Sequence, residues 1–184
     1  MYDRRQRQLC ISDRFPIGRF VIPESIDSTQ IQESVSYLIK FSSYLETALV
    51  GKDEAYLDTP YRPGGWMIKQ VIHHLADSHM NAFIRFKLAL TEENPTVKGY
   101  DEAAWASLPD SVIGIESSMA IIKAVHEKWG VLLSAMKVAD FQKTFFHSEK
   151  QRNQSLAEVA LMYAWHGMHH LAHVRLPDLQ QVKR

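Results

Sequence analysis

Four histidines fall within eight residues near the end of the chain, in the stretch YAWHGMHHLAH: His166, His169, His170 and His173. Only Gly167 would weaken a helix there, and each helical residue turns the chain by roughly 100°. The four imidazoles therefore lie along one side of a helix. Neutral imidazole is a common protein ligand for zinc and related metals. The stretch predicts a metal site built on a helix.

The apolar residues of the same helix indicate which of these histidines face the core. They are Leu156, Val159, Ala160, Tyr163, Leu171 and Val174. His166 and His170 lie closest to this face, one turn apart, and imidazoles at i and i+4 can hold one metal ion together. His169 and His173 lie further round the helix, at rim or supporting positions. The sequence predicts an inward ligand pair, His166 and His170.

A second histidine cluster, HHLADSH at residues 73–79, offers a third ligand. The apolar face of its helix is formed by Ile68, Val71, Ile72, Leu75, Ala82, Phe83 and Phe86. His73 points away from this face, His79 points into it, and His74 lies on its edge. Periodicity therefore leaves His74 and His79 as alternatives. Three protein ligands and an open position are the pattern of a catalytic zinc site.

Polar residues continue from His74 along one side of the same helix, at Ser78, Asn81 and Arg85. Such a stripe beside an apolar face is typical of one wall of a polar cleft. Asn81 and Arg85 are therefore candidates for holding a substrate carboxylate. A structural salt bridge is the alternative for Arg85.

Four long helical patterns position these clusters, and they predict an all-α, four-helix bundle. The patterns run from about residue 28 to a stop at Gly51, over 66–91, over 113–138, and from a Ser155-x-x-Glu158 capping box to a stop at Pro177. Residues 140–153 predict a break with a short edge strand or hairpin. We expect an irregular arm over 1–27 and a single domain over 28–184.

Composition narrows the class of protein. The 184 residues are 46% apolar and 23% charged, with a formal net charge of zero, so no broad basic field attracts nucleic acid or anionic lipid. A single cysteine, Cys10, excludes a disulfide framework and suits a reducing compartment such as the cytoplasm. We expect no signal peptide and no membrane-spanning segment.

Three stretches carry a resemblance to a known family: DTPYRPGGWMIKQVIHHLADSHMNAFIRFKLALTEENP, YDEAAW and YAWHGMHHLAH. They resemble the DinB superfamily, and most closely its YfiT-like branch of metal-dependent hydrolases. The resemblance runs from about Phe15 to His173. It implies a four-helix bundle, a homodimer, and one divalent ion per subunit, zinc or nickel. Matched motif by motif, it implies His74, His166 and His170 as the metal ligands.

The motif at the first ligand is His166-Gly167-x-x-His170, without the glutamate that serves as the base of a zincin peptidase. A hydrolase of small molecules would then depend on the metal to lower the pKa of a bound water. Asp77 could orient a ligand, and Tyr163 could offer a phenol to the cleft, although a surface hydrogen bond and core packing are the stronger interpretations. No catalytic residue is assigned.

A metal with an open position can also bind a thiol and present it as a thiolate nucleophile. Relatives in the superfamily use low-molecular-weight thiols, and the YfiT-like branch resembles transferases for bacillithiol. The alternatives are thus a hydrolase, a thiol S-transferase, and a non-catalytic metal-binding stress protein. A fourth interpretation is a bundle whose histidines only pack.

Overall fold

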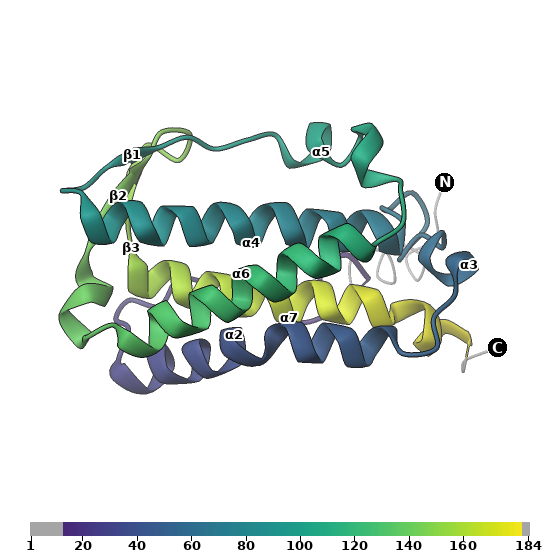
Figure 1. Ribbon diagram of the computed structural model, residues 1–184, viewed down its shortest axis with the longest axis horizontal. Helices are drawn as coiled ribbons and strands as arrows, with labels where there is room; N and C mark the ends of the chain where they lie inside the picture. The colour runs from purple at the N-terminus through teal and green to yellow at the C-terminus, as the bar shows by residue number, and fades with distance from the viewer. Residues whose placement is uncertain (1–12, 182–184) are drawn as a thin grey trace.

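The computed structural model describes residues 13–181, and four long helices form most of it (Figure 1). These are α2 (Ser28–Leu49), α4 (Ile68–Thr91), α6 (Glu116–Ala135) and α7 (Leu156–Gln181). Short elements connect them: α3 (Glu54–Leu57), β1 (Thr96–Val97), α5 (Glu102–Trp105), the 3₁₀ turns η1 (Pro109–Ser111) and η2 (Val138–Gln142), β2 (Thr144–His147) and β3 (Arg152–Ser155). The predicted four-helix bundle is confirmed. Residues 1–12 of the predicted arm, with Cys10, lie outside the described residues.

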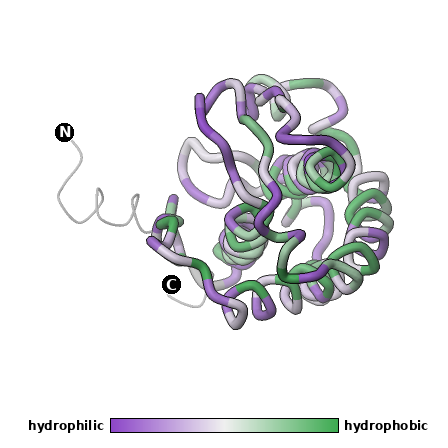
Figure 2. Tube along the Cα trace, turned by 90° about the vertical axis from the view of Figure 1, so that its left-hand side faces the viewer, coloured by the Kyte–Doolittle hydropathy of each residue, from purple (hydrophilic) through white to green (hydrophobic). Residues whose placement is uncertain are grey.

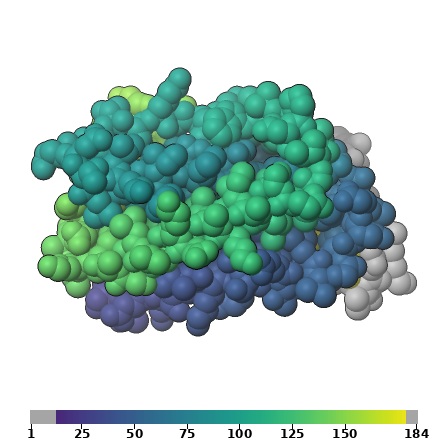
Figure 3. Space-filling view, in the orientation of Figure 1, coloured from purple at the N-terminus to yellow at the C-terminus, as the bar shows by residue number. Residues whose placement is uncertain are grey.

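The helices pack in an order that differs from their order in the sequence. Both α2 and α4 pack against α6 and against α7. Helices α2 and α4, which follow each other along the chain, therefore lie across the bundle from one another. Figure 2 looks along the bundle with the helices end on, and Figure 3 shows α6 crossing the near face between α4 and α2. No helix between residues 13 and 181 is long and apolar enough to cross a membrane.

Helix ends follow the local chemistry at the start of α2 but not at the end of α7. The Asp27 side chain accepts from the Gln30 backbone N–H at 2.9 Å, and the Gln30 side chain accepts from the Asp27 N–H at 3.0 Å, which completes a capping box. The prediction that Pro177 ends the last helix is wrong, because α7 continues through it to residue 181. Val174 and Leu176 are buried there, so packing outweighs the hydrogen bond that proline removes.

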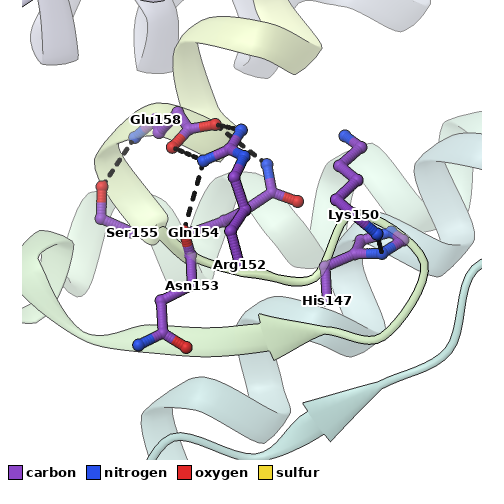
Figure 4. A network of polar contacts seen from close by, with 7 residues as sticks. All are labelled: His147, Lys150, Arg152, Asn153, Gln154, Ser155 and Glu158. Carbon is purple, nitrogen blue, oxygen red and sulfur yellow. Dashed lines mark hydrogen bonds and ion pairs between the residues drawn. The ribbon is translucent and has the colours of Figure 1, made fainter.

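The predicted hairpin before α7 is present. Strands β2 and β3 pair antiparallel, and β1 adds to β2 in parallel as a third strand that the sequence did not predict. Ser155 caps α7 by accepting from the Glu158 N–H at 3.2 Å. The Glu158 carboxylate accepts instead from Arg152 at 2.9 Å and from Gln154 at 3.0 Å (Figure 4). This network ties the hairpin to the first turn of α7.

The core divides into two apolar clusters. One surrounds Trp129, Phe86 and Phe145, and the other contains Phe41, Ile72 and Leu75. His79 contacts both clusters, because the centroid of its ring lies 4.9 Å from that of the Phe41 ring and 6.3 Å from that of the Trp129 ring. The buried histidines therefore lie where the two apolar clusters meet.

Candidate metal centre

Three histidine side chains converge between α4 and α7. His74 comes from α4, and His166 and His170 come from successive turns of α7. One ring nitrogen of each lies within 4.8 Å of the other two, and Nε2 of His74 is 3.1 Å from Nε2 of His166. Two nitrogens bound to one tetrahedral zinc at 2.0–2.1 Å would be about 3.3 Å apart. The arrangement fits a single ion of zinc size.

Burial keeps these imidazoles in the form that binds metal. It lowers the pKa of His74 to about 4, and it lowers the pKa values of His166 and His170 well below the ordinary value. Neighbouring imidazoles lower these pKa values further. The three rings are therefore neutral near pH 7, with lone pairs available to a cation.

A cavity of about 450 Å³ opens beside the three nitrogens. Loop residues Tyr61, Arg62 and Trp66 form one wall, and Arg14 and Phe15 of the arm form another. Glu102 and Ala103 of α5 also line it. A metal ion held by His74, His166 and His170 would thus keep one side open to small molecules, as a catalytic metal requires.

The loop before α4 forms its wall of the cavity through a tight turn. Pro60 and Met67 form a bridge, and Gly64 has a φ of +69°, which favours glycine. Gly65 leaves no room for a side chain, since a Cβ there would lie 2.8 Å from Cγ of Arg62. The turn brings Trp66 to 5.2 Å from the His74 ring and Tyr61 to 4.1 Å from the His173 ring.

Three charged residues of this cavity were not predicted from the sequence: Arg14, Arg62 and Glu102. Arg62 belongs to the PYRPGGW turn, and Glu102 belongs to the YDEAAW motif. Both motifs were part of the family resemblance, but helical spacing could not show that their charged residues line a cavity. Burial raises the pKa of Glu102, while Lys150 and Arg85 lower it in part. Glu102 is a carboxylate that could accept a proton within this cavity.

Asn81 and Arg85, which the sequence predicts as substrate-binding residues, are not among the residues that line this cavity. Asn81 donates to the carbonyl of Asp77 at 2.9 Å, and Arg85 donates to the carbonyl of Lys98 at 3.2 Å. Arg85 is eleven residues beyond His74, which is roughly 16 Å along a helix. The polar stripe leads away from the three candidate ligands toward β1.

His73 is buried rather than solvent-facing, although it does point away from the cluster. Its Nδ1 accepts from the Ser118 hydroxyl at 2.7 Å, and its Nε2 donates to the Ile113 carbonyl at 3.2 Å. It therefore secures the start of α6. We expect removal of His73 to lower stability, because these two buried hydrogen bonds would be lost.

Tyr163 packs in the core, as the stronger interpretation had it, and its hydroxyl accepts from Ser78 at 3.4 Å. His169 and His173 flank the three candidate ligands and line the cavity. The His169 ring stacks on Trp165 at 4.6 Å, and nitrogens of His169, His170 and His173 also lie within 4.8 Å of one another.

Packing against α2 explains why a glycine, and no glutamate, follows the candidate ligand His166 on α7. A Cβ at this position would lie 2.9 Å from the Phe41 ring and 3.2 Å from the Tyr37 ring, both on α2. A glutamate side chain has no space between these two helices. The zincin-type base is therefore excluded by packing.

Replacing Gly167 with alanine should destabilise the protein by about 1 kcal/mol. Alanine gains about 1 kcal/mol in helix propensity, but overpacking against Phe41 costs about 1–3 kcal/mol. Urea denaturation of Gly167→Ala measures the net change. The matched control is Gly167→Ala combined with Phe41→Leu, which removes the ring that the methyl group meets. If Gly167→Ala lowers the free energy of unfolding by the same amount with Phe41 and with Phe41→Leu, this packing explanation is contradicted.

Comparison with known proteins supports a metal-dependent function. The family model described as DinB superfamily matches residues 40–174. A protein of Bacillus cereus (strain 03BB102) named "Putative metal-dependent hydrolase" is 44% identical over 161 residues, covering 88% of this chain and 92% of that protein. A protein of Bacillus mycoides (strain KBAB4) with a similar name has the same identity and coverage.

A solved structure agrees with these relatives. YfiT from Bacillus subtilis, described as "a probable metal-dependent hydrolase with an unusual four-helix bundle topology", superposes with a TM-score of 0.87 at 38% identity. The superposition covers 92% of this chain and 98% of YfiT.

Proposed function

Because this chain belongs to the DinB superfamily, we propose that it is a metal-dependent hydrolase of small molecules. One divalent ion would be held by His74, His166 and His170. The observation that carries the proposal is the convergence of three neutral imidazole nitrogens within 4.8 Å beside an open cavity. Zinc is the ion that three imidazoles and an open position suit best, and nickel is the alternative.

When bound, the ion would supply a water of lowered pKa and a Lewis acid for the substrate. The cavity residues have separate parts in this proposal. Arg14 and Arg62 both line the cavity, and their guanidinium groups would bind an anionic group of the substrate. Glu102 would accept a proton. Trp66, Tyr61 and Phe15 would limit the access of bulk water and pack against apolar substrate groups.

Thiol transfer to an electrophile is the second candidate function. The packing of Phe41 and Tyr37 at Gly167 excludes a base beside the first ligand. A metal-bound thiol needs no such base, because the metal itself favours the thiolate. The same three histidines and cavity would serve this reaction.

The test uses untagged protein loaded with zinc or nickel, incubated with an activated ester or an alkyl electrophile. Each substrate is given in water alone and with a panel of small thiols, and products are identified by mass spectrometry. Hydrolysis without thiol supports the hydrolase, and thiol conjugates alone support the transferase. Bound metal without turnover supports the non-catalytic stress protein. Failure to bind metal in a 1:1 ratio contradicts all three.

Two further expectations accompany the proposal. The family resemblance implies a homodimer, which light scattering of the purified protein tests. We also propose a cytoplasmic location, since a chain with a single cysteine needs no oxidising compartment.

A further inference from the structure

A row of hydrogen-bonded imidazoles leads from one candidate ligand into the core. Nδ1 of His166 lies 3.2 Å from Nε2 of His79, and Nδ1 of His79 lies 2.8 Å from Nε2 of His126. Nδ1 of His126 lies 2.7 Å from the carbonyl oxygen of Leu38. We call these residues the first histidine chain. It crosses the bundle from α7 through α4 and α6 to α2.

The Leu38 carbonyl sets the direction of every hydrogen bond in the first histidine chain. A carbonyl oxygen only accepts, so Nδ1 of His126 carries a proton. Nε2 of a neutral His126 must then accept from Nδ1–H of His79, and Nε2 of His79 must accept from Nδ1–H of His166. The proton of His166 is thereby held on Nδ1. Its Nε2 lone pair is left facing His74.

The opposite direction would need a doubly protonated ring. If Nε2 of His126 also donated, His126 would be an imidazolium that is 2% exposed. Its ring packs against Phe41 and Trp129 as well as His79. Burying a cation among these rings is costly, so the neutral arrangement prevails.

A second, shorter row supports the other candidate ligand on α7. Nδ1 of His170 lies 3.2 Å from Nδ1 of His173, and Nε2 of His173 lies 3.3 Å from the carbonyl oxygen of Arg14. By the same reasoning His173 carries its proton on Nε2 and accepts from Nδ1–H of His170. The Nε2 lone pair of His170 is left free. We call these residues the second histidine chain.

We propose that His79, His126 and His173 are positioning residues that fix the tautomers of His166 and His170, so that both Nε2 lone pairs are directed at one metal ion. The inference rests on the proposed metal site. Both histidine chains end on a backbone carbonyl, which cannot take up a proton. They therefore orient the ligands and do not conduct protons away from the cavity.

The first arm of the test measures zinc affinity in His126 variants. His126→Leu leaves Nδ1–H of His79 without an acceptor and allows His79 to move its proton to Nε2, which forces the His166 proton onto the metal-binding nitrogen. Losing such a supporting partner costs about 10- to 100-fold in metal affinity. His126→Gln keeps an oxygen that accepts and an amide that donates, so it should restore most of the affinity.

His73→Leu is the matched control, because His73 is also buried and hydrogen-bonded but belongs to neither histidine chain. It should lower stability without weakening zinc binding. If His126→Leu binds zinc with the same affinity as the wild-type protein, the inference is overturned and the proposed function still stands. Wild-type protein that binds no zinc would overturn the proposed function instead.

The second arm needs neither variants nor metal. Long-range ¹H–¹⁵N spectra of metal-free wild-type protein report which ring nitrogen is protonated. We expect Nδ1–H for His126, His79, His166 and His170, and Nε2–H for His173. A proton on Nε2 of His79 or His166 would contradict the first histidine chain even if zinc binds tightly.

Discussion

Replacing both His166 and His170 with alanine should abolish binding of a divalent metal while leaving the bundle folded. The pair supplies two of the three converging nitrogens. The one imidazole that remains would bind zinc too weakly to retain one ion per subunit. The apolar clusters around Trp129 and Phe41 do not depend on either ring, so the helices should persist. Metal analysis after dialysis and far-UV circular dichroism measure the two outcomes.

The gain in stability on adding zinc measures how much metal binding the double variant has lost. A ligand at 100 times its Kd stabilises a folded protein by about 2.7 kcal/mol. Wild-type protein should show that gain, and the double variant should show none. His74→Ala should behave like the double variant, whereas His73→Leu should keep the zinc-dependent gain. Retention of stoichiometric metal by the double variant would rule out the assignment of the ligands.

Metal-free protein should lose stability steeply as the pH falls below about 6.5. Burial, the largest cause in each case, lowers the pKa values of eight histidines: His74, His79, His126, His147, His166, His169, His170 and His173. Between the ordinary pKa of 6.5 and a folded pKa of about 4, as for His126, the unfolded chain binds a proton that the folded chain does not. Stability therefore rises with pH across this window.

Each such histidine changes the free energy of unfolding by up to about 1.4 kcal/mol per pH unit within the window. A domain with about 5–15 kcal/mol of stability cannot withstand several of these together. Urea denaturation at pH 8, 7, 6 and 5 should show a falling midpoint and unfolding near pH 5. His126→Gln removes one titrating ring and should flatten the slope. Equal unfolding free energies at pH 7 and pH 5 would refute the expectation.

Regular spacing predicted the parts of this protein that depend on helical periodicity. The four-helix bundle and the inward orientation of His166 and His170 follow from which residues share a helix face. The hairpin follows instead from the strand-like break between the last two helical patterns. Spacing left His74 and His79 as alternatives because both lie near the apolar face of α4. In the structure the two have different partners: Nε2 of His74 lies beside Nε2 of His166, whereas Nε2 of His79 lies beside Nδ1 of His166. The proposed ligand set therefore takes His74.

The features that the sequence did not predict depend on tertiary contacts, which leave no periodic pattern in the sequence. Arg14 and Arg62 reach the cavity from the arm before α2 and from a glycine-proline turn, where no helical period was visible in the sequence. Arg85 belongs to the correct helix but lies too far along it. Pro177 ends many helices, yet here the burial of Leu176 keeps α7 intact. In each case tertiary packing overrides the local signal.

The close approach of α2 to α7 at Gly167 limits how this scaffold could be redesigned. Installing a peptidase-like base by Gly167→Glu would force two helices apart, because the rings of Phe41 and Tyr37 already fill that space. An engineer who wants a stronger base should start from the Arg62 turn or from Ala103, where side chains border open volume rather than a helix seam. New chemistry on this bundle would then enter through its connecting loops.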